Sequence, residues 1–196
     1  MPVNRSIPDV AQKRKDWNGL ISGFKASDLV FLDESGCNTD MTRRYAYSLG
    51  GSRAVDSAPL SKPKNTTILP SIQLDGTLRY TTFSGGTTVE RFKRYLETDL
   101  LPHLNGNSVL IMDNMKSHHP KAVKNLLDSS EIRYIYLPPY SPDLNPIEKL
   151  WSKVKAFLRK FKARTLDALP NAIQNAFHSV TISDCSGWFR FCGYAL

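Results

Sequence analysis

Two short apolar segments of the chain each end in an aspartate. Leu29–Leu32 is followed by Asp33, and Val109–Met112 is followed by Asp113. Four consecutive apolar residues are typical of a buried strand, and ligand sites in α/β sheets gather at the carboxyl ends of strands. If the strands are neighbours, the two carboxylates repel each other unless a proton or a cation lies between them. For either aspartate alone, ending a strand or starting a turn is the commoner role.

A third carboxylate, Glu148, stands at the start of the clearest helical pattern in the sequence. Apolar residues recur at helical spacing from Ile147 to Phe161, which predicts an amphipathic helix. Asn145 suits its N-cap and Pro146 its first position, so a capping box is an alternative role for Glu148. On a helical wheel, however, Glu148 shares a flank with three basic side chains, Lys155, Arg159 and Lys162.

The charge of the chain points to a polyanionic partner. The 196 residues include 26 Lys and Arg against 18 Asp and Glu, a formal net charge of +8. Residues 149–196 carry eight basic and two acidic side chains, whereas residues 29–148 carry thirteen of each. Nucleic acid is the natural partner of such a basic segment, although a solvated basic helix face is a common alternative. Carboxylates that bind Mg²⁺ beside phosphate-binding cations would suit phosphodiester chemistry.

The remaining pattern predicts a mixed α/β sheet. A helix is expected within residues 10–24, and three strands, at 44–48, 66–74 and 78–83, suggest an antiparallel meander. Further along, helices alternate with strands, which implies parallel pairing: a helix from residue 88 to 100, a strand at 109–112, a helix at 121–128 and a strand at 132–137.

Several classes of protein are disfavoured by what the sequence lacks. No apolar run approaches the roughly 18 residues of a membrane helix, and the first residues do not form a signal peptide. Cys37, Cys185 and Cys192 lack zinc-ligand spacing, so we expect reduced, structural thiols. Trp151, Trp188 and Phe189 are expected in the core or an interface. These features predict a cytoplasmic protein with no membrane partner.

Three blocks of residues together resemble the transposases of the bacterial insertion-sequence 630 and eukaryotic Tc1/mariner superfamily. They are Leu32–Gly36, the triplet 112–114 with His118, and Tyr140–Trp151. Residues 114–147, 34 in all, separate the second acid from the third, which matches the D-D-34-E spacing of the Tc1-like branch. The resemblance covers roughly residues 10–165.

The resemblance implies a ribonuclease-H-like fold, with a mixed five-stranded sheet flanked by helices and a catalytic helix packed across the first and fourth strands. It divides the chain into an N-terminal lead-in helix (1–28), a catalytic domain (29–165) and a C-terminal helical extension (166–196).

The implied activity is that of a DDE-type transposase: metal-dependent cleavage at transposon ends, then strand transfer by attack of a 3′-hydroxyl on target DNA. The catalytic, metal-binding residues would be Asp33, Asp113 and Glu148, holding two Mg²⁺ ions for which Mn²⁺ can substitute. Asn114 and His118 are candidate supporting residues. Glu34 is left out because side chains alternate along a strand. The expected DNA contacts are Lys149, Lys155, Arg159 and Lys162.

The implied partners are double-stranded DNA, both terminal inverted repeats and target, and a second copy of the chain in a homodimer. Full-length relatives carry an N-terminal helix-turn-helix region, whereas fewer than 30 residues precede the first catalytic strand here. We therefore expect either a separately encoded helix-turn-helix part or a truncated copy. The expected location is the cytoplasm of a bacterium, in association with the nucleoid.

Two other functions remain open at this stage. One is a ribonuclease-H-like or resolvase-like nuclease, which would share the fold and metals but not the Ser-Pro-Asp-Leu-Asn-Pro block at 141–146. The other is a non-cutting, DNA-binding remnant of a transposase, against which the presence of all three acids argues.

Overall fold

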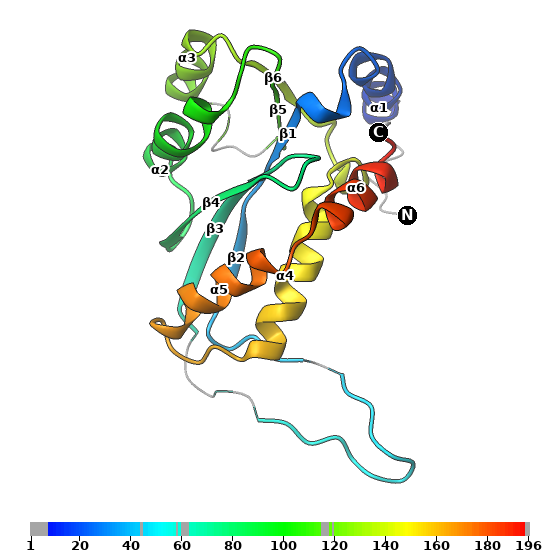
Figure 1. The fold of residues 1–196 in the computed structure, drawn as a ribbon, viewed down its shortest axis with the longest axis vertical. Coiled ribbons are helices and arrows are strands. Elements are labelled where there is room, and N and C mark those ends of the chain that lie inside the picture. The colour runs from blue at the N-terminus through cyan, green and yellow to red at the C-terminus, as the bar shows by residue number, and fades with distance from the viewer. Residues whose placement is uncertain are drawn as a thin grey trace.

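A six-stranded mixed sheet forms the centre of the structure, a computed structural model that describes residues 8–43, 45–57, 59, 63–114, 118 and 120–194. Figure 1 shows the sheet between two layers of helices, with a long arm projecting from one end. The strands are β1 (Leu29–Leu32), β2 (Ser35–Asn38), β3 (Asn65–Ile72), β4 (Leu78–Ser84), β5 (Val109–Met112) and β6 (Arg133–Tyr136). This confirms the predicted mixed α/β class.

The strand pairing separates an antiparallel half from a parallel half. β3 pairs antiparallel with β1, β2 and β4, whereas β1, β5 and β6 pair parallel to one another in that order. β1 and β2 lie against successive parts of β3, since Leu32 is opposite Ser71 and Ser35 is opposite Ile68. The expected count of five strands is therefore wrong. A short break after β1 separates it from β2, which would otherwise continue β1 as one strand, and the sheet therefore has six strands.

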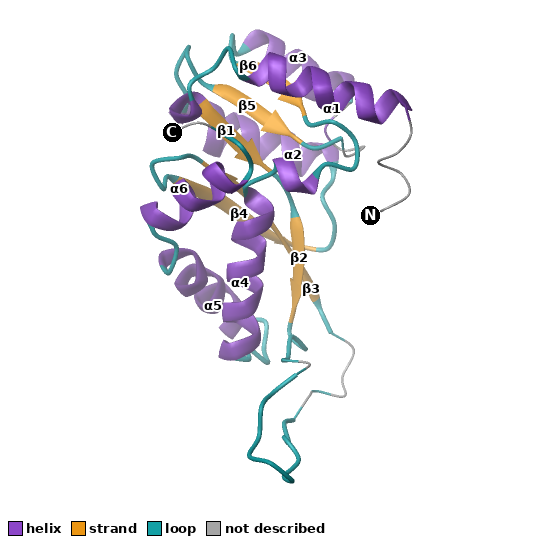
Figure 2. Ribbon diagram, turned by 90° about the vertical axis from the view of Figure 1, so that its right-hand side faces the viewer, coloured by secondary structure: helices purple, strands orange, loops and turns teal. Residues whose placement is uncertain are grey.

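Six helices cover the two faces of the sheet (Figure 2). Their bounds are α1 (Pro8–Ile21), α2 (Val89–Tyr95), α3 (Lys121–Ser129), α4 (Ile147–Phe161), α5 (Ala168–His178) and α6 (Ile182–Phe191). α2 continues into one π-helical turn, Leu96–Leu100. One hydrophobic core lies between the sheet and α2 and α3, and the other lies between the sheet and α1, α4, α5 and α6.

Alternation of side chains along the two central strands builds both cores at once. In β1, Leu29 and Phe31 belong to the core on the α4 side, whereas Val30 and Leu32 belong to the core on the α2 side. β5 alternates in the same way. Because both faces are buried, every position of these strands is apolar, which explains their continuous apolar sequences.

Helix α4 forms as its sequence pattern predicts. Its apolar side packs on the sheet through five buried residues, Ile147, Leu150, Trp151, Val154 and Leu158. Phe161, expected on the same apolar side, is instead 44% exposed, because it lies in the last turn. The helix then ends at Lys162, which takes the left-handed conformation common at helix C-termini.

The predicted strand at 44–48 is not present among the described residues of that segment, which exclude Arg44. Residues 45–48 lie in the arm, which we define as the connection 39–64 between β2 and β3. The side chains of Tyr45 and Tyr47 alternate with smaller residues as in a strand, but both are fully exposed. No strand among the described residues pairs with this segment, so the alternation does not produce a ladder.

Two further features concern the cysteines and the length of the helices. All three cysteines are buried and unbonded, as predicted for reduced, structural thiols. Among the described residues, no helix has both the length and the apolar content needed to cross a membrane.

Leu150 tests the packing of α4 on the sheet. Because its side chain is fully buried, Leu150→Ala should lower the free energy of unfolding by about 2–5 kcal/mol through lost contacts and a cavity. Ser152→Ala, on the exposed side of the same helix, should change it by less than about 0.5 kcal/mol. Urea denaturation measures both, and equal effects of the two variants would contradict the packing described.

Candidate active site

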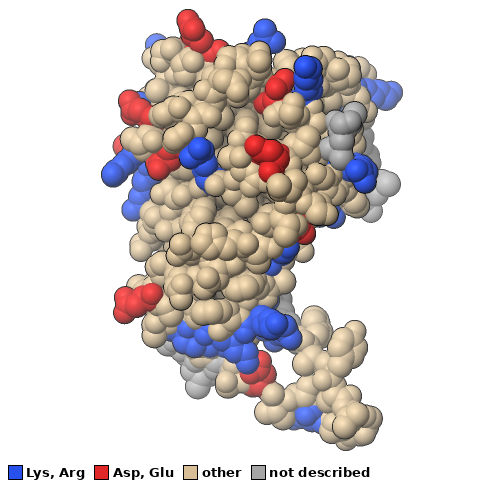
Figure 3. Space-filling model, in the orientation of Figure 1, with Lys and Arg blue, Asp and Glu red and all other residues tan. Residues whose placement is uncertain are grey.

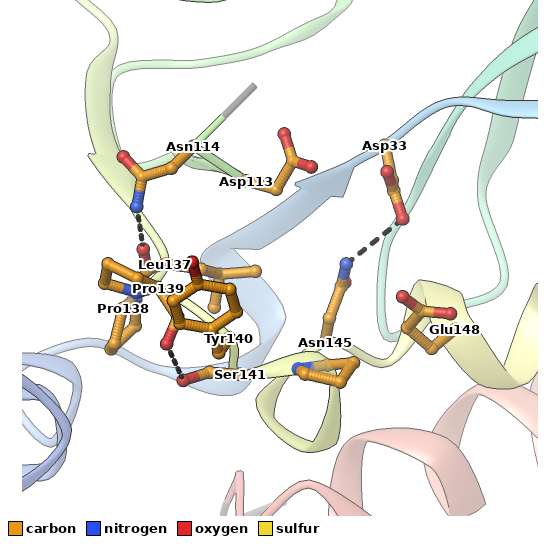
Figure 4. Close-up of a pocket in the computed structure, with 11 residues that line it drawn as sticks. Asp33, Asp113, Asn114, Leu137, Pro138, Pro139, Tyr140, Ser141, Asn145 and Glu148 are labelled. Carbon is orange, nitrogen blue, oxygen red and sulfur yellow. Dashed lines mark hydrogen bonds between the residues drawn. The ribbon is translucent and has the colours of Figure 1, made fainter. Parts of the chain in front are cut away.

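An open cavity of about 410 Å³ lies where β1 and β5 end. Asp33, Asp113 and Glu148 all line it, and Figure 4 shows their side chains around it. The three acids predicted from the sequence therefore come together from three separate segments of the chain.

The sheet positions the two aspartates. β1 and β5 are parallel neighbours in register, with Leu32 opposite Met112, so the residues that follow them emerge at the same end of the sheet. The alternation that directs Phe31 toward α4 directs Asp33 to that face as well, where it meets Trp151 of α4. Asp113 also lines the cavity, but its carboxylate lies 2.9 Å from His118, whose ring stacks on Phe92 in the core on the α2 side. Glu34 falls on the other side of the chain and is not among the residues that line the cavity.

Glu148 comes from the first turn of α4, and Figure 4 shows its carboxylate directed toward Asp33. The capping-box alternative loses its donor, because the backbone N–H of Asn145 donates to the carbonyl of Pro142 at 3.2 Å. Burial raises the pKa of Glu148 and the Asp113 charge adds to this, while Lys155 opposes it. Lys155 thus acts on the same flank as Glu148, as the helical wheel indicates.

The pKa of Asp33 is raised far above its ordinary value. Its side chain is almost completely buried, at 7% exposure. Burial, together with repulsion from Asp113 and Glu148, raises the pKa of Asp33 to about 7. A carboxylate held at this cost without a counter-charge is typical of a functional site.

Three hydrogen bonds fix the orientation of the Asp33 carboxylate. Oδ1 accepts from the backbone N–H of Glu34 at 2.7 Å. Oδ2 accepts from Nδ2 of Asn145 and from Nε1 of Trp151, each at 3.3 Å. Asn145 also accepts from the backbone N–H of Ile147 at 3.3 Å, so it serves the helix start and Asp33 together.

Neither Asn145 nor Trp151 was expected from the sequence to contact an acid. Asn145 was predicted as an N-cap, and Trp151 as a core aromatic, which its burial confirms. The available signal was spacing: the two residues lie three positions before and three after Glu148. Because the sequence does not show that Asp33 lies beside this helix, the spacing alone could not predict the two hydrogen bonds to Asp33.

The two candidate supporting residues lie on either side of Asp113. His118 is buried, with Nδ1 2.9 Å from Oδ1 of Asp113, and its ring stacks on Phe92 at 4.3 Å between centroids. Asn114 lines the cavity and donates to the carbonyl of Leu137 at 2.6 Å. His119, the next residue after His118, lies outside the described residues.

The four basic residues predicted to contact DNA are spread along α4. Nζ of Lys149 lies 3.7 Å from the centre of the Phe191 ring on α6. Arg159 lines a second open cavity at the base of the arm, and Lys162 forms an ion pair with Asp56 of the arm. Figure 3 shows a cluster of Lys and Arg side chains on this lower part of the molecule.

The pH dependence of stability tests the burial of Asp33. The folded protein keeps this proton up to about pH 7, whereas the unfolded chain loses it near 3.8, so metal-free stability should fall as the pH rises between these values. Asp33→Asn removes the charge and should stabilise the protein in EDTA at about pH 8 by roughly 1–4 kcal/mol. The gain should vanish below about pH 4, where the parent is also neutral.

Urea denaturation across this pH range measures the effect. Asp167→Asn is the matched control, because Asp167 is exposed and its replacement should change stability by less than about 0.5 kcal/mol. A parent and an Asp33→Asn variant of equal stability at about pH 8 would show that the carboxylate is neither desolvated nor repelled.

Solved structures with this fold include several of the Mos1 transposase. A Mos1 paired-end complex with the left transposon end matches with a TM-score of 0.79 and 18% identity, over 94% of this chain and 59% of the Mos1 chain. A structure of the Mos1 catalytic domain with raltegravir and Mg matches with a TM-score of 0.65 and 16% identity, over 92% of this chain and 88% of the other. The fold is therefore ribonuclease-H-like, as expected.

Sequence comparison identifies the family directly. The Tc1 transposase of Caenorhabditis elegans is 28% identical over 97 residues, which are 47% of this chain and 36% of the Tc1 protein. The chain thus spans about a third of the Tc1 protein and about three fifths of the Mos1 chain that it matches. The family model described as DDE superfamily endonuclease matches residues 28–170, a segment that contains all three acids of the cavity. The chain belongs to the DDE superfamily endonuclease family.

Proposed function

We propose that this chain is the catalytic domain of a DNA transposase that cleaves DNA at transposon ends and transfers the freed strand to target DNA. The observation that carries the proposal is the convergence of Asp33, Asp113 and Glu148 on one cavity, at the start of a helix whose exposed side is basic. The Tc1 and Mos1 relatives, which are themselves transposases, support it.

The side chains of the cavity fit a hard divalent cation. The three acids offer only oxygen donors, which Mg²⁺ and Mn²⁺ prefer. Mutual repulsion contributes to the raised pKa of both Asp33 and Glu148, and a cation between the carboxylates would relieve it. Mos1 structures are described as complexes with Mg and with Mn.

We infer two ions, the number commonly used for in-line displacement at a phosphodiester. Asp33, Asp113 and Glu148 would together hold these ions. Bound there, the ions would neutralise phosphate charge, activate the attacking oxygen and stabilise the leaving oxygen of a phosphodiester.

The protein's own contribution is to hold these carboxylates in place. Asn145 and Trp151 fix one oxygen of Asp33 from α4, and His118 holds one oxygen of Asp113 from the opposite side. Asn114 stands at the cavity edge, where it can contact substrate. No side-chain nucleophile is needed, since water attacks in cleavage and a DNA 3′-hydroxyl attacks in strand transfer.

The basic side of α4 would hold DNA on either side of the cut. Lys149 and Lys155 lie near Glu148, while Arg159 and Lys162 lie about three to four helical turns further along. We therefore assign these four residues to DNA phosphates at increasing distance from the reacting one.

The complete system would contain further parts. We propose a homodimer acting on two transposon ends, with end recognition supplied by a helix-turn-helix region encoded separately. The substrates would be the terminal inverted repeats and target DNA. The positive charge of the chain suits association with the nucleoid in a bacterial cytoplasm.

Replacement of any of the three acids tests the assignment. Asp33→Asn, Asp113→Asn and Glu148→Gln should each reduce Mg²⁺-dependent cleavage of DNA carrying the terminal repeat by at least about 100-fold, because each removes a charged metal ligand. DNA binding measured in Ca²⁺ should remain. Glu34→Gln, next to Asp33 but outside the cavity, should cleave normally, and normal cleavage by any of the three variants would remove that acid from the site.

The products of the same reaction separate the possible activities. End-specific nicking followed by strand transfer supports a transposase. Cutting that depends on branched or hybrid structure would instead indicate a resolvase-like or ribonuclease-H-like nuclease, and binding without cutting would indicate a remnant.

Salt dependence tests the DNA-binding side of α4. Lys155→Ala and Arg159→Ala should each weaken duplex binding and reduce the slope of log affinity against log salt by about one, because each removes one phosphate contact. Lys124→Ala, on α3 at the other face of the sheet, should leave the slope unchanged. Fluorescence anisotropy across a salt series measures all three, and equal slopes would exclude this surface as the DNA site.

A further inference from the structure

Tyr140 presents an aromatic ring to solvent at the edge of the catalytic cavity. It lines the cavity together with the three acids, yet its side chain is 55% exposed. Figure 4 shows it across the cavity from Glu148, with Asn145 between them. The cleavage and strand-transfer mechanism proposed above assigns no task to an aromatic ring. It therefore does not account for an exposed tyrosine at the edge of the catalytic cavity.

The backbone of Tyr140 is held in a conformation that tyrosine rarely adopts. Its φ angle is +55°, in the left-handed region. Among the described residues, only two others that are not glycine share this feature, and both lie at helix C-termini, where it is common: Lys162 directly follows α4, and Glu131 lies two residues beyond the end of α3. Tyr140 follows no helix, and strain of this kind at non-helical positions gathers at ligand sites.

The loop around Tyr140 is restrained on both sides. Pro138 and Pro139 precede it, and the Ser141 hydroxyl donates to the carbonyl of Pro139 at 3.1 Å. Arg14 of α1 in turn donates to the Ser141 hydroxyl at 2.5 Å and to both carboxylate oxygens of Asp143. The ring therefore stands on a fixed support and forms a preorganised surface.

We propose that Tyr140 is a stacking platform for an unpaired nucleobase next to the reacting phosphate. This proposal rests on the proposed function. If a DNA phosphate binds at the three acids, the nucleobase next to that phosphate is the aromatic group close enough to stack on the Tyr140 ring. The cavity of about 410 Å³ is large enough for a small-molecule-sized group. A base inside a duplex has both faces covered by its neighbours, so the occupant is a base at a frayed, nicked or flipped position.

Two variants at this one position separate the ring from the backbone. Tyr140→Phe keeps the ring and removes the hydroxyl. Tyr140→Asn removes the ring and tolerates a positive φ better than tyrosine, so its unfolding midpoint should be equal or higher. A loss of function in Tyr140→Asn without a loss of stability is a result that a merely structural role would not give.

Cleavage in Mn²⁺ of two matched DNAs measures the stacking. Both are duplexes with a two-nucleotide 3′ overhang, one with normal bases and the other with abasic sites in the overhang. The parent chain and Tyr140→Phe should prefer the normal overhang by about 5- to 100-fold in kcat/KM, the range expected for one stacked base. Tyr140→Asn should cleave both DNAs equally, and a parent that does not discriminate would overturn the proposal.

A binding measurement keeps this test separate from that of the proposed function. With 2-aminopurine in the overhang and Ca²⁺ in place of Mn²⁺, stacking should quench the fluorescence with the parent and Tyr140→Phe but not with Tyr140→Asn. Quenching without any cleavage would refute the proposed activity and leave the base site standing. Cleavage by the parent with identical fluorescence for all three proteins would refute the base site alone.

Discussion

The close approach of three carboxylates is the constraint on which the rest of the structure depends. Parallel pairing of β1 with β5 brings Asp33 and Asp113 to one end of the sheet, and the first turn of α4 adds Glu148. Such a group resists folding, because desolvation and mutual repulsion both disfavour the charged forms. The apolar cores on both faces of the sheet must supply the opposing stability, which is why β1 and β5 are completely buried.

The signature block at 140–151 is the part of the chain that holds this arrangement together. It carries one acid, Glu148, and two donors to another acid, Asn145 and Trp151. Residues near the two ends of the described chain hold it from outside: Arg14 of α1 bonds to Asp143, and the hydroxyl of Tyr194, three residues after α6, donates to the carbonyl of Leu144 at 2.5 Å. Substitutions in α1 or near Tyr194 can therefore alter the positions of the acids through this block.

Much of the fold follows from the sequence because burial on both faces, or on one side of a helix, leaves a clear periodic pattern. β1, β5 and α4 are found where apolar runs and helical spacing predict them, and the acids at their ends share a cavity. β2 was not predicted, because Ser35–Asn38 is polar and forms a strand only through its pairing with β3. The contact of Trp151 with Asp33 and the left-handed backbone of Tyr140 are tertiary features that leave no periodic trace.

The arm begins and ends at adjacent points of the sheet, because Asn38 and Asn65 are paired residues of β2 and β3. Its two ends are therefore joined by the ladder whatever lies between them, and the entropic cost of closing such a loop rises only slowly with length. Insertions and deletions within the exposed stretch 45–57 should leave the two cores and the three acids unaffected, whereas Met41 at the base of the arm packs on the core. This connection is thus where related chains can diverge in length and sequence while the catalytic framework stays constant.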